Sequence, residues 1–191
     1  MLLADLLADP RLARFRLAEA SLRQPKEANA FNIEGLSATP QSQLLIGLRN
    51  PVPNGKALLI PLLNPEEIVQ GSGTRARFGE AFQLDLGGLG IRDIALYQDK
   101  YVIIAGPYHQ GGKFQLYRWN GDTSEPTPIT VKHLDRYHPE AIVIYPDKGL
   151  NEFQILSDDG NEPVDGVPGK QVQDHSRKQF RSFWVTRDPI R

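Results

Sequence analysis

The stretch GIRDIALYQDKYVIIAGPYH, residues 90–109, decides the fold because its pattern occurs three times in the chain. It contains an acid near its start, an apolar run of strand length, a polar turn, a second apolar run and a polar stop. NIEGLSATPQSQLLIGLRNP (32–51) and HPEAIVIYPDKGLNEFQILSDDG (138–160) have the same order. The three acids, Glu34, Asp93 and Glu140, are therefore equivalent positions of a repeat, with spacings of 59 and 47 residues. Periods of about 40–50 residues are typical of β-propeller blades.

Within these units and between them, short runs rich in β-branched and aromatic residues are bounded by Gly, Pro, Asn or Asp. Such runs predict strands joined by tight turns. Several of them, such as ALLIPLL and YVIIAG, are apolar on both faces, as expected for strands enclosed between two neighbouring layers. The predicted strands lie at 33–38, 43–49, 57–63, 80–86, 91–97, 101–106, 113–119, 128–134, 140–145, 152–157 and 182–186.

The sequence therefore predicts an all-β protein, with residues 31–191 forming a partial or oligomer-completed β-propeller of about three four-stranded blades. We expect the blades at about 31–86, 87–136 and 137–187. Residues 1–30 are predicted to form an appendage of short helices over 2–8 and 11–20, because apolar residues recur there at helical spacing. A β-sandwich whose strand pairs resemble one another is the alternative.

Three blades raise a packing problem, because a closed propeller usually has four to eight. Two apolar end faces would be left open, and such faces indicate an interface. We expect them to be covered by further blades of a longer chain, by a second copy that completes a six-bladed ring, or on one face by the N-terminal helices.

Composition excludes several classes of protein. The chain has 191 residues, a net charge of −1 and no cysteine, so disulfides and thiolate chemistry are excluded and no global field attracts nucleic acid or an acidic membrane. No apolar run reaches the roughly 18–20 residues that span a bilayer. The N-terminus lacks the basic start of a signal peptide, and Asp5 and Asp9 interrupt its apolar stretch. A cytoplasmic location is the default expectation.

Several of these runs resemble a bacterial family catalogued as domain of unknown function 3616, over about residues 28–187. The resemblance is carried by FNIEGLSA, LLIGLRNP, KALLIPLLNP, LDLGGLGIRDIA, YVIIAGP, GGKFQLYRWNG, PEAI, LSDDG and RSFW. It implies a propeller-like fold, with members that begin further upstream, and it transfers no catalytic residue. The IEGL opening is similar, more loosely, to phytase-like esterases and lactonases, in which an early glutamate corresponding to Glu34 helps to hold a divalent metal.

In a propeller the first strand of each blade lines the central channel, so we expect Glu34, Asp93 and Glu140 to converge there. Asp158 would join them from the end of a second strand. Carboxylates that converge need a cation among them, and oxygen-rich sets suit Ca²⁺ or Mg²⁺. The competing interpretation is that each acid binds backbone N–H groups or an arginine and so clasps two blades.

Other polar residues close to these acids are weaker candidates. Arg49, Asn50 and Arg92 could form a ligand site, because a guanidinium fork matches a carboxylate or phosphate; the same residues could instead be structural ion-pair partners. His138 lies two residues before Glu140, so a general-base role beside Glu34 is conceivable. The acidic stretch SDDGNEPVDG (157–166) misses the calcium-loop pattern and predicts an Asp-Gly turn.

Two functional hypotheses follow. The first is a propeller-like domain that binds a small ligand or a protein partner at its channel mouth, without an assigned reaction. The second is a divalent-metal-dependent hydrolase in which Glu34, Asp93, Glu140 and Asp158 hold a cation that activates water. The first is favoured, because an incomplete ring cannot assemble a complete channel site by itself.

Overall fold

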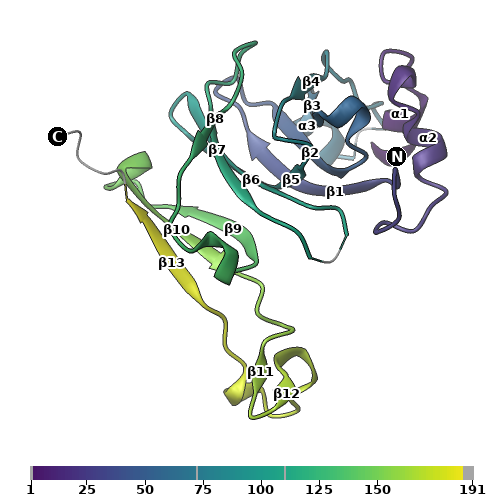
Figure 1. Ribbon diagram of the computed structural model, residues 1–191. Helices are drawn as coiled ribbons and strands as arrows, with labels where there is room; N and C mark the ends of the chain where they lie inside the picture. The colour runs from purple at the N-terminus through teal and green to yellow at the C-terminus, as the bar shows by residue number, and fades with distance from the viewer. Residues whose placement is uncertain (1, 72, 110, 187–191) are drawn as a thin grey trace.

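The structure, a computed structural model, describes residues 2–71, 73–109 and 111–186. It is mostly β, with four antiparallel sheets of two to four strands and short helices. Figure 1 shows three larger sheets placed one after another along the chain, and an arm with a two-stranded hairpin that projects away from them. In the part of the chain that is described, the sheets do not close into a ring.

Each of the first two sheets is a simple meander of four strands. In both sheets neighbouring strands are consecutive in sequence, so every connection is a local turn or loop. The strands of the first sheet are β1 (Asn32–Ala38), β2 (Leu44–Asn50), β3 (Ala57–Leu62) and β4 (Phe82–Leu84). The strands of the second sheet are β5 (Gly90–Tyr97), β6 (Lys100–Gly106), β7 (Gln115–Trp119) and β8 (Thr127–Ile129).

The third sheet has three strands in the order β13-β10-β9. Its strands are β9 (Pro139–Ile144), β10 (Glu152–Ser157) and β13 (Ser182–Thr186). The projecting arm lies between β10 and β13 and contains the hairpin β11 (Pro163–Val164) and β12 (Val167–Pro168). The hairpin turns at Asp165 and Gly166, both of which have positive φ, and this confirms the Asp-Gly turn predicted from sequence.

The helices are short. They are α1 (Leu2–Ala8), α2 (Leu17–Ala20) and α3 (Pro65–Val69), with 3₁₀ turns η1 (Ala13–Phe15), η2 (Pro53–Gly55), η3 (Leu134–Arg136), η4 (Gly149–Asn151), η5 (Gly169–Gln171) and η6 (His175–Arg177). The helix predicted over 2–8 is confirmed. The single helix predicted over 11–20 is wrong, because Arg16 has φ of 54° and divides it into η1 and α2. This break lets Phe15 and Leu17 both be buried.

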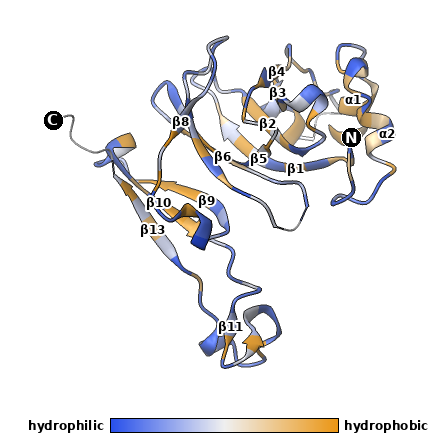
Figure 2. Cartoon of the chain, in the orientation of Figure 1, coloured by the Kyte–Doolittle hydropathy of each residue, from blue (hydrophilic) through white to orange (hydrophobic). Residues whose placement is uncertain are grey.

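Apolar side chains fill the spaces between consecutive layers. One cluster, which includes Leu59, Ile91 and Trp119, joins the first sheet to the second. Another, which includes Ile104 and Phe153, joins the second sheet to the third. All residues of β3, and all of β6 except Lys100, are buried, which confirms the expectation from their two apolar faces. In Figure 2 hydrophobic residues concentrate in strands such as β2 and β9, while the loops are mostly hydrophilic.

The two end faces of this stack differ. Leu6, Leu12 and Leu17 from the N-terminal segment pack against Ile46 and Ile60 of the first sheet, so the helices cover its outer face, as one of the alternatives proposed. On the outer face of the third sheet Trp184 is exposed, and it packs against Tyr145 with ring centroids 5.3 Å apart. One end of the stack is therefore capped by the chain itself.

Candidate functional site

Four charged residues near the strand ends occupy irregular positions of the sheets. The register skips Glu34 and Arg49 between β1 and β2, and Arg92 between β5 and β6. It also skips Glu140, because Ala141 pairs with Leu156 and Pro139 with Ser157. An extra residue in a bulge is free of ladder pairing and its side chain is re-aimed. All four side chains are turned in this way toward one place.

Arg92 lies between the two glutamates of this group. Its Nε lies 3.0 Å from Glu34 Oε2, without the angle of a hydrogen bond, and its Nη2 donates to Glu140 Oε2. The Arg92 side chain is 9% exposed, that of Glu34 23% and that of Glu140 40%. The two carboxylates compensate the charge of the Arg92 guanidinium and fix its orientation. Of the two, Glu140 is the more exposed to solvent.

Arg49 supports the other side of Glu34. Its Nη1 donates to Glu34 Oε1 at 2.7 Å, and its Nε donates to the Pro107 carbonyl oxygen at 2.9 Å. The Arg49 side chain is 8% exposed. Glu34 therefore compensates two nearly buried guanidinium groups, one from each of the first two sheets, and Arg49 also ties the end of β2 to the segment that follows β6.

The space around Arg92 depends on Gly106 at the end of β6. A Cβ atom at this position would lie 2.9 Å from Arg92 Cγ and 2.7 Å from the Phe114 ring. Without it, Phe114 approaches the guanidinium, whose carbon lies 5.8 Å from the ring centroid. This distance is within the range of a cation–π contact. The arginine is thus held by carboxylates and by an aromatic face.

These residues line a cleft of about 460 Å³, which we call the polar cleft. Lys26 from the N-terminal segment lines it, together with His109 and His138. Asp158 and Asn161 contribute from the start of the projecting arm. Arg49, Glu34, Arg92 and Glu140 form a row of alternating charges in the cleft. The lining side chains come from all three larger sheets or the loops beside them.

Asp93 does not take part in this group. Its Oδ1 accepts from its neighbour Ile94 N and its Oδ2 from Ile142 N of β9, both at 2.8 Å. It thereby links β5 to β9, and burial raises the pKa of the carboxyl group. The bulge makes Arg92, rather than Asp93, the structural counterpart of Glu34 and Glu140. Asp93 therefore joins two sheets by accepting hydrogen bonds from backbone N–H groups, as the competing interpretation of the acids predicts.

The remaining predicted residues are placed as follows. Asn50 is buried, and its amide nitrogen donates to the Glu27 carbonyl oxygen at 2.7 Å, which holds the N-terminal segment against β2. Asp158 lines the polar cleft, and its Oδ1 accepts from Gly160 N at 2.9 Å. His138 is half exposed at the rim, with Nδ1 4.0 Å from Glu162 Oε1. Of the predicted residues, Glu34, Arg49, Arg92, Glu140, His138 and Asp158 share the polar cleft.

The carboxylates do not form a set that fits a divalent metal. Within 2–71, 73–109 and 111–186, no group of three or more His, Cys, Asp or Glu is placed to hold a metal ion. Arg92 lies between Glu34 and Glu140, where a cation would have to lie, and both Asp93 oxygens accept backbone hydrogen bonds. Arginine thus supplies the positive charge that converging carboxylates require.

Comparison with protein families gives one match. Residues 1–148 fit the model of a family described as a protein of unknown function, DUF3616. The chain belongs to the DUF3616 family. The matched part contains Glu34, Arg49, Arg92 and Glu140, and it ends before β10 and the projecting arm. It therefore includes the N-terminal helices and stops earlier than the resemblance over 28–187 suggested.

No curated protein and no solved structure matches this DUF3616 chain significantly. Among its described residues no helix is long and apolar enough to cross a membrane. The functional inference for this family member therefore rests on its own side chains.

The projecting arm of this DUF3616 protein is anchored by a buried carboxylate. Asp159 accepts from Arg181 Nε and Nη2, both at 2.8 Å, and from Ser157 Oγ at 2.7 Å. The Arg181 guanidinium in particular lowers the pKa of Asp159 to about 2. The ionised carboxylate thus joins the start of the arm to the residue just before β13.

We expect Asp159→Asn to lower the free energy of unfolding by roughly 2 kcal/mol at pH 7. Because the pKa of Asp159 is depressed, its ionised carboxylate stabilises the fold fully at pH values above the ordinary pKa of 3.8. This contribution is lost as the pH falls from 3.8 through about 2. Urea unfolding at a series of pH values would measure it. The difference between the two proteins should shrink within that window. Asp147→Asn, at an exposed site, is the control, and an equal effect there would contradict the assignment.

Proposed function

We propose that this protein binds a small anionic ligand, one that carries a carboxylate or a phosphate, in the polar cleft. The observation that carries the proposal is Arg92, a nearly buried guanidinium whose second partner, Glu140, is 40% exposed. Among the described residues its Nη1 has no hydrogen-bond partner. A planar fork of this kind matches a carboxylate or phosphate group.

The carboxylate of Glu140 marks where the anion of a ligand would lie. It is bound to Arg92 from the third sheet, and its exposure means that solvent reaches the pair. A ligand anion would exchange with Glu140 on Arg92, while Glu34, held by both arginines, stays in place. Lys26 and the half-exposed His138 supply further positive or hydrogen-bonding groups at the rim.

We also propose that the three larger sheets are propeller-like blades and that the polar cleft is the mouth of their common channel. This proposal is supported by the equivalent places of Glu34, Arg92 and Glu140 at the bulged starts of β1, β5 and β9. It is supported as well by the consecutive packing of the sheets. A metal-dependent hydrolase is not proposed, because Arg92 lies between the carboxylates.

Variants with opposite expected effects test the binding proposal. Isothermal titration calorimetry at constant ionic strength would use inorganic phosphate, citrate and succinate as probes. Glu140→Gln removes the competing carboxylate, so we expect it to bind the preferred anion about tenfold more tightly. Lys26→Ala removes a positive charge from the lining of the polar cleft, so we expect it to bind the same anion several-fold more weakly. Each tenfold change in affinity corresponds to about 1.4 kcal/mol of binding free energy.

Lys100→Ala is the matched control, because this lysine begins β6, whereas the polar cleft lies at the end of that strand. It should leave the affinity unchanged. If neither the natural protein nor Glu140→Gln binds any of the three anions, the proposal is refuted. An equal loss of affinity in Lys26→Ala and Lys100→Ala would show only general attraction by positive charge.

A further inference from the structure

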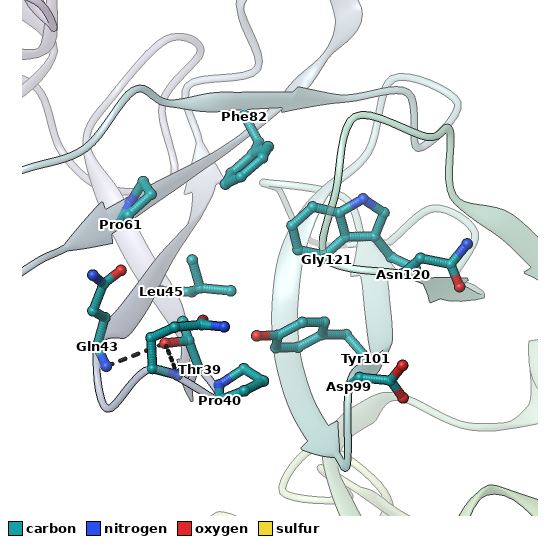
Figure 3. A pocket seen from close by; sticks show the side chains of 12 residues that line it. Thr39, Pro40, Gln43, Leu45, Pro61, Phe82, Asp99, Tyr101, Asn120 and Gly121 are labelled. Atoms are coloured by element: carbon teal, nitrogen blue, oxygen red, sulfur yellow. Dashed lines mark hydrogen bonds between the residues drawn. The ribbon is translucent and has the colours of Figure 1, made fainter.

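A second cavity, of about 260 Å³, opens at the opposite end of the first two sheets. It lies beside the turn between β1 and β2 and the turn between β5 and β6, whereas the polar cleft lies where β2 and β6 end. Figure 3 shows Leu45, Pro61 and Phe82 of the first sheet on one side of this space and Tyr101 of the second sheet across from them. Trp119 also lines the space. We call it the aromatic cavity.

The three rings come from β4, β6 and β7, and they form a continuous wall. Phe82 and Trp119 meet edge to face with centroids 5.0 Å apart, and Tyr101 and Trp119 lie 5.2 Å apart. Trp119 is 1% and Tyr101 3% exposed. Trp119 Nε1 donates to the Asp122 carbonyl oxygen at 3.1 Å. The wall is thus fixed before any ligand arrives.

Gly121 lets the ring of Tyr101 pack close to the main chain. Its φ is +78°, and a Cβ atom there would lie 2.9 Å from Tyr101 Cε2. Any L-residue at this position would be strained and would press on the tyrosine ring. The packing of Tyr101 therefore depends on this glycine.

The charge of the lining is negative. Asp99, exposed at the rim, is the one charged residue among the residues that line the aromatic cavity, and the other polar members are amides and a threonine. Lys100, next in sequence, does not line the aromatic cavity. Aromatic rings attract cations through their quadrupole, and a carboxylate beside them adds to that attraction.

We propose that the aromatic cavity binds a methylated ammonium group. Its volume lies below the roughly 300–1,000 Å³ typical of drug-sized ligands, so it fits a compact headgroup. Methyl groups would contact Phe82, the partly exposed ring of the wall, while the buried rings of Tyr101 and Trp119 hold it in place. The positive charge would lie near Asp99. A neutral group of the same shape would keep the apolar contacts and lose the electrostatic ones. This site is separate from the polar cleft, and the two proposals can fail independently.

The test compares choline with its neutral isostere 3,3-dimethylbutan-1-ol. Binding would be followed by calorimetry and by the fluorescence of Trp119 in a Trp184→Phe background, since Trp184 lies on the outer face of the third sheet. We expect saturable binding of choline and at least about tenfold weaker binding of the alcohol. Nε-trimethyl-lysine, tested alongside, would show whether the same group is accepted when it belongs to an amino-acid side chain.

Two variants localise the effect. Asp99→Asn, at an exposed position, should weaken choline binding several-fold and leave the binding of the alcohol unchanged. Phe82→Leu keeps apolar volume and removes one ring, so it should weaken choline more than the alcohol, provided that its melting temperature shows a folded protein. Asp135→Asn, at an exposed site away from the cavity lining, is the control. Equal binding of choline and the alcohol, or no saturable choline binding, would overturn the proposal.

Discussion

Glu34→Gln is expected to lower the free energy of unfolding by about 3 kcal/mol, although glutamine keeps the shape of the side chain. The carboxylate compensates Arg49 and Arg92, whose side chains are 8% and 9% exposed. Removing one partner of a nearly buried ion pair leaves an uncompensated charge, which costs roughly 3–5 kcal/mol. We choose the lower end, because Glu34 is itself partly exposed and Glu140 still contacts Arg92.

Urea unfolding at pH 7 would measure this loss, and for a chain of this size we expect the melting temperature to fall by about 6–12 °C. Glu19→Gln is the matched control, because Glu19 pairs with Arg16 on the surface. Surface pairs contribute about 0–1 kcal/mol, so this variant should be close to the natural protein. A Glu34→Gln protein as stable as the Glu19→Gln protein would contradict the role assigned to Glu34.

The strands were the most predictable part of the fold. Each of the eleven predicted runs overlaps one of the strands β1 to β10 or β13. Runs such as YVIIAG are short, apolar on both faces and bounded by turn residues, and a strand enclosed between two layers is the simplest element that satisfies all three features. The two-residue strands of the arm were not predicted, because a hairpin so short depends on its turn and not on a hydrophobic pattern.

The candidate site could be predicted only in part, because the bulges are not visible in the sequence. Alignment of acid with acid made Asp93 the equivalent of Glu34, whereas the register makes it Arg92. A difference of one residue turns a side chain to the other face of a sheet. Three like charges that would repel one another become two glutamates with an arginine between them. The adjacency of Arg92 and Asp93 is the signal that could have raised this alternative.

The aromatic cavity was not predicted. Trp119 is buried, as expected for an aromatic residue that packs between two sheets. The cavity beside it is bounded by turns of two different sheets, which are 60 residues apart at Thr39 and Asp99. A space between two loops depends on how the sheets pack, and no local pattern records it. The glycine in WNG predicts a turn but does not show that a ring fills the place of its side chain.

Gly90→Ala is expected to be as damaging as the loss of Glu34, by a different mechanism. Gly90 begins β5 and is buried against the end of β2. An alanine Cβ would overlap the Arg49 carbonyl oxygen, and it would lie 2.5 Å from the Arg49 carbonyl carbon and 2.8 Å from its Cα. These are backbone atoms, so no rotamer change can relieve the overlap, and the first two sheets would have to separate.

Overpacking of this kind costs about 1–3 kcal/mol and occasionally more, and we expect about 3 kcal/mol because both partners are main chain. Gly79→Ala is the control: its Cβ would meet side-chain atoms of Pro61, at 3.1 and 3.2 Å, and of Leu63, at 3.4 Å, and its effect should stay within about 1 kcal/mol. Because the displaced residue is Arg49, Gly90→Ala should also weaken anion binding in the polar cleft if the protein stays folded. An alanine variant with unchanged stability would mean that the two sheets do not approach each other at Gly90.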